Sequence, residues 1–176
     1  METVIYQGIQ YRRLDKHWVD ERYLAVSEEL QDILNKAYLE TLNLDLLDSR
    51  ELIQRGDQCK ATGSVFLAIQ LYEKAIQRGT TADARGVLPR LTSCYRKQGF
   101  PKKAIDCAVE LRHRFGPDIL SPVTLTSLAA AYCDLGEWAL ARKCADRAYA
   151  SGAKGAGELR AVYERIRLHT EGKQRS

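Results

Sequence analysis

Residues 125–148 of the 176-residue chain read LTSLAAAYCDLGEWALARKCADRA. Gly136 divides this stretch into two segments that are rich in leucine and alanine. Tyr132 stands four residues before the glycine, and Ala141 stands five residues after it. Glycine accepts the positive φ of a tight turn, and alanine allows a second helix to approach the first closely. The stretch therefore predicts two antiparallel helices joined at Gly136.

The same pattern occurs twice upstream. Gly63, Gly99 and Gly136 lie 36 and 37 residues apart. One helix pair cannot cover its own apolar face, whereas stacked pairs cover one another, so a period in the thirties indicates a helical solenoid. The sequence therefore predicts three antiparallel helix pairs. The residues that recur around the glycines are Leu52, Leu88 and Leu125 eleven positions before, Gly56, Thr92 and Ala129 seven positions before, and Ala68, Ala104 and Ala141 five positions after.

The segment before the repeats has a different pattern. Residues 3–24 carry β-branched and aromatic residues in rough alternation, which predicts a β-hairpin. Ser27, followed by Glu28 and Glu29, is typical of a helix N-terminus, because serine caps the first turn and acidic residues suit the helix dipole. A hairpin is marginal alone, so we expect residues 1–45 to dock on the first repeat through one stripe of this helix. The stripe comprises Leu30, Ile33, Leu34, Ala37 and Tyr38.

The segment after the repeats predicts a capping helix. Its apolar residues recur at intervals of three and four, which places them on one helical face that closes the open end of the stack. The glycine-rich residues 152–157 are predicted to link the repeats to this helix. We expect the helical domain to cover residues 46–169 and a frayed tail to cover residues 170–176. The apolar face comprises Leu159, Val162, Tyr163 and Ile166.

The clearest repeats are Gly56–Gly63 with Ala68–Ala75, Tyr95–Gly99 with Ala104, and Leu125–Tyr132 with Gly136, Trp138, Ala141 and Ala148. On these stretches, roughly residues 49–169 resemble the tetratricopeptide repeat family. The resemblance implies a mainly α fold, an antiparallel helix-pair solenoid with a right-handed superhelix, preceded here by the small hairpin and helix. It also implies a non-catalytic scaffold or adaptor that holds a peptide or partner-protein segment in a concave groove. Pro89 implies either a late start or a kink in the first helix of the second repeat.

The resemblance also implies which side chains line that groove, because in this family the first helix of each pair faces it. Arg90, Arg96 and Lys97 from the second repeat give the groove a positive strip, so we expect an acidic or carboxylate-bearing ligand. Relatives that hold a C-terminal carboxylate use lysines and asparagines here. Ile53 and Asp57 replace two of them, which argues against such a clamp. The predicted groove residues are Gln54, Asp57, Lys60, Arg90, Ser93, Arg96, Lys97, Ser127, Cys133 and Asp134.

Charge is distributed unevenly along the chain. Residues 1–50 carry a net charge of −4 and residues 51–176 a net charge of +8. The basic part supports a second hypothesis, a nucleic-acid-associated or regulatory protein, although a charged face can also serve only solubility. The sequence has neither an apolar run long enough to cross a membrane nor a secretory signal, so we expect a cytoplasmic protein without a membrane partner. No feature indicates whether the chain forms a homo-oligomer.

The sequence contains no pattern of a catalytic or metal site. The five cysteines include no C-x-x-C pair, and the three histidines are scattered, so we expect neither a metal nor a cofactor. Phosphate-binding and nucleophile motifs are also absent, which predicts that the chain is not an enzyme. We expect all five thiols to be reduced and mostly buried, as cysteines in repeat columns pack like small apolar residues. Cys133, on the predicted groove, is the one candidate for reactivity.

Overall fold

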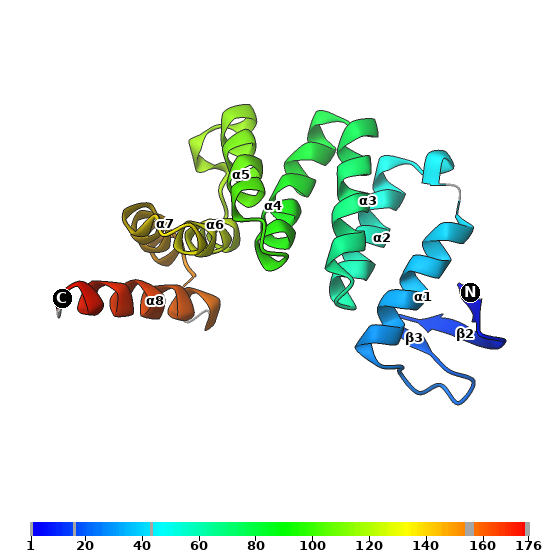
Figure 1. Ribbon diagram of the computed structural model, residues 1–176. Coiled ribbons are helices and arrows are strands. Elements are labelled where there is room, and N and C mark those ends of the chain that lie inside the picture. The colour runs from blue at the N-terminus through cyan, green and yellow to red at the C-terminus, as the bar shows by residue number, and fades with distance from the viewer. Residues whose placement is uncertain (1, 16, 43, 154–156, 175–176) are drawn as a thin grey trace. The chain divides into compact units, whose positions relative to one another are not determined.

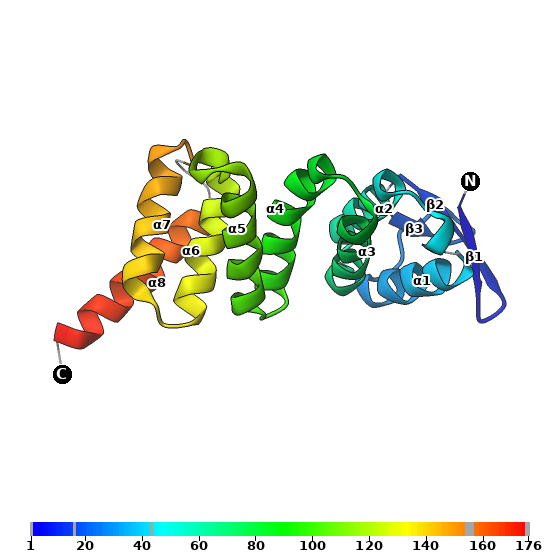
Figure 2. The same cartoon turned by 90° about the horizontal axis from the view of Figure 1, so that it is seen from above.

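The computed structural model describes residues 2–15, 17–42, 44–153 and 157–174, without the side chains of residues 173 and 174. Lys154–Ala156, at the centre of the predicted linker, lie outside the described residues. Residue contacts divide the chain into two compact units, a first unit of residues 1–87 and a second unit of residues 88–176. The first unit contains a sheet and helices, and in the second unit the structure describes helices (Figures 1 and 2).

The first unit begins with a three-stranded antiparallel sheet. Its strands are β1 (Thr3–Tyr6), β2 (Ile9–Leu14) and β3 (His17–Val19), in that order across the sheet. The predicted hairpin was therefore one strand short. Gln7 and Gly8 have φ angles of 50° and 80°, which is the geometry of a two-residue hairpin turn. This turn splits what reads as a single strand and pairs Val4 with Tyr11.

The helix predicted at Ser27 is α1 (Glu28–Thr41), and the Ser27 hydroxyl accepts a hydrogen bond from the Leu30 N–H at 3.4 Å. Its apolar stripe packs on the sheet, not on the first repeat as predicted. Leu34 is fully buried there, whereas Ile33 is 41% exposed. The sheet explains the difference, because a small sheet must bury one face and α1 is its neighbour (Figure 1). The other members of this core are Val4, Tyr11 and Trp18, with Leu30, Ala37 and Tyr38 partly buried.

A buried asparagine joins the sheet and α1 to the first repeat. Asn35 is 1% exposed, and its carbonyl oxygen accepts a hydrogen bond from the Trp18 indole N–H at 2.8 Å. Its amide nitrogen donates to the hydroxyls of Thr62 and Ser64, at 3.0 Å and 2.7 Å. Those two residues flank Gly63 in the turn of the first helix pair. The docking of α1 and the sheet on the first repeat thus rests on these buried polar contacts.

The first helix pair consists of α2 (Ser49–Ala61) and α3 (Val65–Arg78), after the 3-10 helix η1 (Leu44–Leu46). Gly63 has a φ of +85° at the turn between the helices, as predicted. Gly56 permits their close approach, because an added Cβ would lie 2.5 Å from the Tyr72 ring. Arg55 of α2 strengthens the N-terminal docking through the Tyr38 hydroxyl and the Glu2 carboxylate, both at 3.1 Å.

The next helix, α4 (Thr81–Lys97), contains the division between the units. It begins eight residues before Pro89, so a late start with proline in the first turn is wrong. The second unit continues with α5 (Pro101–Phe115), the 3-10 helix η2 (Pro117–Ile119), α6 (Pro122–Asp134), α7 (Trp138–Ala150) and α8 (Gly157–Gln174). Gly99 and Gly136 have φ angles of +75° and +76° at the turns within pairs. The seven helices predicted after residue 48 are confirmed, and Ala68, Ala104 and Ala141 are all fully buried.

The last helix, α8, packs against α6 and α7 and buries Leu159, Val162 and Ile166. Two ion pairs fix it further, between Glu158 and Arg96 of α4, and between Arg165 and Asp134 of α6 at 2.8 Å. The predicted tail starts later than expected. Residues 170–174 belong to α8, because the Thr170 hydroxyl donates to the Ile166 carbonyl and Arg167 pairs with Glu171, which supports another turn. Residues 175 and 176 lie outside the described residues, and the domain boundary near residue 45 stays a prediction.

Replacing the buried asparagine tests the polar docking. We expect Asn35→Ala to lower the free energy of unfolding by about 2 kcal/mol, because it leaves the Trp18 N–H buried without an acceptor. Urea denaturation measures the difference. Gln77→Ala on the exposed surface of α3 is the matched control and should change stability by less than about 0.5 kcal/mol. Equal stability of the Asn35 variant and the wild type would contradict the assignment.

A charge exchange tests the contact between α4 and α8. Arg96→Glu should lower the free energy of unfolding by about 1 kcal/mol, because it places a second carboxylate beside Glu158. Adding Glu158→Arg should recover most of that loss, and a double-mutant cycle in urea measures the coupling. Lys97→Glu, at the exposed neighbouring position, serves as the control. Additive effects of the two reversals would show that the ion pair contributes nothing.

Candidate functional site

In the second unit, α8 engages part of the predicted groove. Ser127 is buried, Arg96 is half-buried in its ion pair with Glu158, and Asp134 accepts from Arg165. Arg96 is therefore not a freely exposed cation of the positive strip. Sequence reasoning assigned α8 only to end capping, so it did not identify the partners Glu158 and Arg165. Nothing in a helical pattern shows which distant charges a capping helix will meet.

Displacing α8 to reopen these positions would be costly. Complete burial of an aliphatic side chain contributes about 1.5–3 kcal/mol, and α8 buries Leu159, Val162 and Ile166. The helix is therefore part of the core of the second unit and does not act as a loose cover. The other predicted residues of this unit differ in exposure. Arg90 and Ser93 are half-buried, and Lys97 is exposed at the end of α4.

In the first unit, two predicted groove residues line a cavity. Gln54 and Asp57 lie on α2 beside a space of about 810 Å³, whose other wall is formed by Asp15 and His17 of the sheet. Lys60, the third predicted residue, is half-buried and does not line this cavity. The sequence could not predict the second wall, because nothing in the hairpin pattern places it next to α2. The remaining lining residues are Arg50, Ile53 and Gln58.

The α2 cavity, as we name this space, offers several kinds of contact. Ile53 supplies an apolar surface, Arg50 a positive charge and Asp15 a negative one. Asp57 accepts a hydrogen bond of 2.6 Å from the Tyr72 hydroxyl, which fixes its carboxylate from α3. The side-chain oxygen of Gln58 is buried and accepts no hydrogen bond from any residue that the structure describes. A buried acceptor without a donor carries a free-energy cost.

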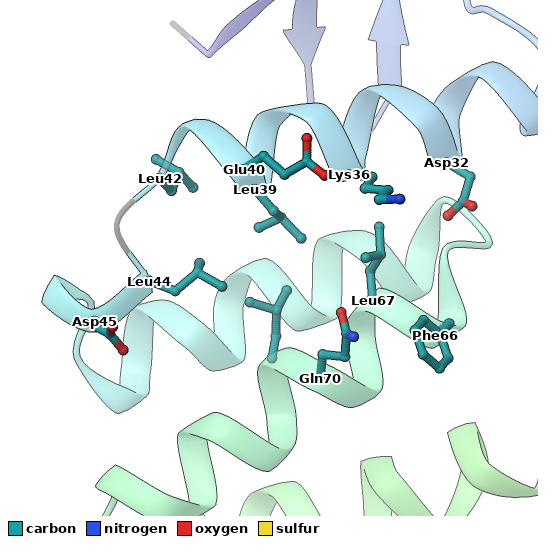
Figure 3. Close-up of a pocket in the computed structure, with 11 residues that line it drawn as sticks. Asp32, Lys36, Leu39, Glu40, Leu42, Leu44, Asp45, Phe66, Leu67 and Gln70 are labelled. Atoms are coloured by element: carbon teal, nitrogen blue, oxygen red, sulfur yellow. The ribbon is translucent and has the colours of Figure 1, made fainter.

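A second cavity of the first unit, of about 730 Å³, lies between α1, η1 and α3 (Figure 3). Leu39, Leu44 and Leu67 point into it, and Phe66 beside it is 57% exposed. Asp45 at one end is held by Lys74 at 2.7 Å and by Arg78, and these hydrogen bonds lower the pKa of its carboxyl. Both signs of charge line this rim, so the surroundings of the cavity favour no particular sign of ligand.

The cysteines behave as packing residues. Burial raises the pKa of the Cys59 thiol to about 11 and also raises that of Cys133. Cys133 is 3% exposed, so its selection as a reactive thiol is wrong, because only an accessible thiolate reacts readily. Cys94 is buried too, whereas Cys107 and Cys144 are half-buried. Cys59, Cys133 and Cys144 are free thiols.

No group of three or more His, Cys, Asp or Glu side chains in the part of the chain that the structure describes could hold a metal ion. Among the helices described, none is long and apolar enough to cross a membrane.

Solved structures show what this arrangement is similar to. The TPR domain of Sgt2 from Aspergillus fumigatus matches with a TM-score of 0.60 and 19% identity, over 73% of this chain and 82% of that one. The C-terminal TPR-containing domain of a Plasmodium falciparum protein described as FK506-binding matches with a TM-score of 0.63 and 15% identity, over 86% and 97%. No protein-family model and no curated protein matches the chain. The chain therefore has a tetratricopeptide-repeat-like fold, a helical solenoid preceded by a small antiparallel sheet.

Proposed function

We propose that the chain is a non-catalytic protein-interaction module, a scaffold or adaptor that binds a segment of a partner protein in the α2 cavity. The observation that carries this proposal is that Gln54 and Asp57, which the repeat pattern assigned to the groove, line a cavity closed on its other side by the sheet. The free thiols of Cys59, Cys133 and Cys144 suit the cytoplasm that we propose as its location, since reducing compartments keep cysteines unpaired.

The lining chemistry suits a peptide backbone. A bound peptide presents both N–H donors and C=O acceptors, and the side-chain amides of Gln54 and Gln58 offer an acceptor and donors for these groups. Ile53 offers the apolar contact that gives a peptide side chain its anchor. The volume lies within the range of roughly 300–1,000 Å³ that binding pockets occupy, which suits a short segment.

Catalysis has less support at this cavity. The side chain of its histidine, His17, forms no hydrogen bond or ion pair with any residue that the structure describes. A general base is normally oriented by a neighbouring group and placed within hydrogen-bond reach of its substrate. The residues that line the cavity include no cysteine or serine that could act as a nucleophile. We therefore assign these side chains to recognition.

Peptide selection tests the proposal. Random peptides displayed on phage are selected on the full chain, and the enriched peptides are synthesised and titrated by fluorescence anisotropy. Ile53→Arg should weaken their binding by about tenfold or more, because truncating or blocking a buried anchor typically costs over 1 kcal/mol. Gln77→Arg, which adds the same charge to an exposed position of α3, should change affinity by less than about twofold.

Two results would overturn the proposal. One is that the selected peptides bind wild type and Ile53→Arg equally, which would place the site elsewhere. The other is that Ile53→Arg lowers the melting temperature along with affinity while Gln54→Ala leaves affinity unchanged, because the loss would then come from misfolding.

A further inference from the structure

The second unit has a cleft of its own between α5 and α7, with α6 as its floor. Figure 2 shows α6 between the other two helices. The space measures about 170 Å³, and the side chains of Leu125 and Leu128 form its buried base. Val109 on α5 and Leu140 on α7 stand at its walls and are 47% and 44% exposed. We call this space the α5–α7 cleft.

The charges around the α5–α7 cleft are all positive. Arg112 from α5, and Lys143 and Arg147 from α7, line it together with apolar residues, and its lining includes no acidic side chain. Within the part of the chain that the structure describes, none of these three cations forms an ion pair. Arg147 donates only to the Pro117 carbonyl, at 3.5 Å. Three like charges that converge without a counter-charge repel one another, so an anion bound between them would be stabilised.

Three acids lie on the same helices, and none of them lines the α5–α7 cleft. Asp106 is exposed on α5, and the other two are held by other cations. Glu110 of α5 pairs with Arg114 at 2.9 Å. Asp146 of α7 pairs with Arg142 at 3.2 Å and accepts a hydrogen bond from Tyr163. The second unit as a whole carries 16 Lys/Arg and 9 Asp/Glu, a net charge of +7, so long-range attraction acts in the same direction.

The size of the α5–α7 cleft limits what can enter it. Pockets for drug-sized ligands measure roughly 300–1,000 Å³, so a space of about 170 Å³ suits a single large side chain. Its base is apolar and its rim cationic. An apolar side chain would remove Val109 and Leu140 from water while carboxylates on either side of it met the three cations.

We propose that the α5–α7 cleft binds an acidic segment of a partner protein, seating one large apolar residue that is flanked by Asp or Glu. This site goes beyond the proposed function, because it lies in the other unit and uses none of the residues of the α2 cavity. A protein segment fits better than a single-stranded nucleic acid. Nucleic-acid binders stack bases on exposed aromatic rings along a charged groove, whereas this cleft is a short apolar depression whose aromatic residue, Tyr132, is half-buried.

The test titrates the full chain with fluorescein-labelled peptides. The probe is Glu-Glu-Asp-Leu-Asp-Glu-Glu, and its partner peptide has glycine in place of leucine at the same charge. Wild type should bind the leucine peptide at least about tenfold more tightly, since burying one leucine contributes about 1.5 kcal/mol or more. Binding should weaken between about 50 and 200 mM salt, because screening reduces the attraction of the cations.

Two matched variants locate the site. The double variant Lys143→Glu with Arg147→Glu should bind the leucine peptide about tenfold or more weakly than wild type, because the rim of the cleft then repels carboxylates. The double variant Lys102→Glu with Arg160→Glu makes the same change in net charge at exposed positions away from the cleft. Its affinity for the leucine peptide should fall by less than about threefold, because only the long-range field changes. Circular dichroism checks that both variants keep the helical fold of the wild type.

Each contrary result overturns the inference. Equal binding of the leucine and glycine peptides would mean that only charge attracts them. Equal losses in the two variants would mean that the cleft has no special role. Tighter binding of a fluorescein-labelled oligothymidine than of the leucine peptide would favour nucleic acid, and no binding at about 1 mM peptide, the weakest useful affinity, would exclude the site. Because the α2 cavity is intact in both variants, none of these results bears on the proposed function.

Discussion

The structure depends on one constraint: a helix pair leaves an apolar face uncovered, and neighbouring elements must complete the core. In the first unit, α1 packs on the sheet and is joined to the α2–α3 pair through Asn35 and Tyr38. In the second unit, α8 covers α6 and α7, with Leu159, Val162 and Ile166 as its buried residues. The repeats themselves are ordinary in their alanine and leucine columns. What distinguishes this chain is how its two ends are covered.

The two covers use different chemistry for a physical reason. The apolar stripe of α1 is already used by the sheet, so its contact with the repeat falls to polar side chains, Asn35 and Tyr38. A buried asparagine with three partners, one on β3 and two in the turn between α2 and α3, has few orientations that satisfy all of them, so it fixes one docking geometry. In contrast, α8 packs on α6 and α7 through apolar side chains and buries Leu159, Val162 and Ile166.

The sequence predicted the helix pairs themselves better than the contacts of the elements that pack on them. Local chemistry was sufficient for the helix pairs, because Gly63, Gly99 and Gly136 each require a positive φ and each sits at a turn. It was insufficient where two surfaces compete for one helix, so the stripe around Leu34 was assigned to the wrong neighbour. The same limit applied to the groove. Arg96 was read correctly as a charged side chain of α4, but its partner Glu158 lies 62 residues away, and helical periodicity contains no information about such pairs.

Covering the ends also determines where a partner can bind. Repeats whose first helices stayed exposed would offer a single groove with one kind of surface chemistry. Here α8 engages Arg96 and Asp134, whereas Arg112, Lys143 and Arg147, which form no ion pair with a described residue, line a cleft between α5 and α7. In the first unit the sheet forms the second wall of the α2 cavity, and Gln54 lines this cavity while remaining exposed. The first unit carries a net charge of −3 and the second a net charge of +7, so the two surfaces attract ligands of different charge. Elements that stabilise the ends of the stack therefore also give each unit its own recognition chemistry.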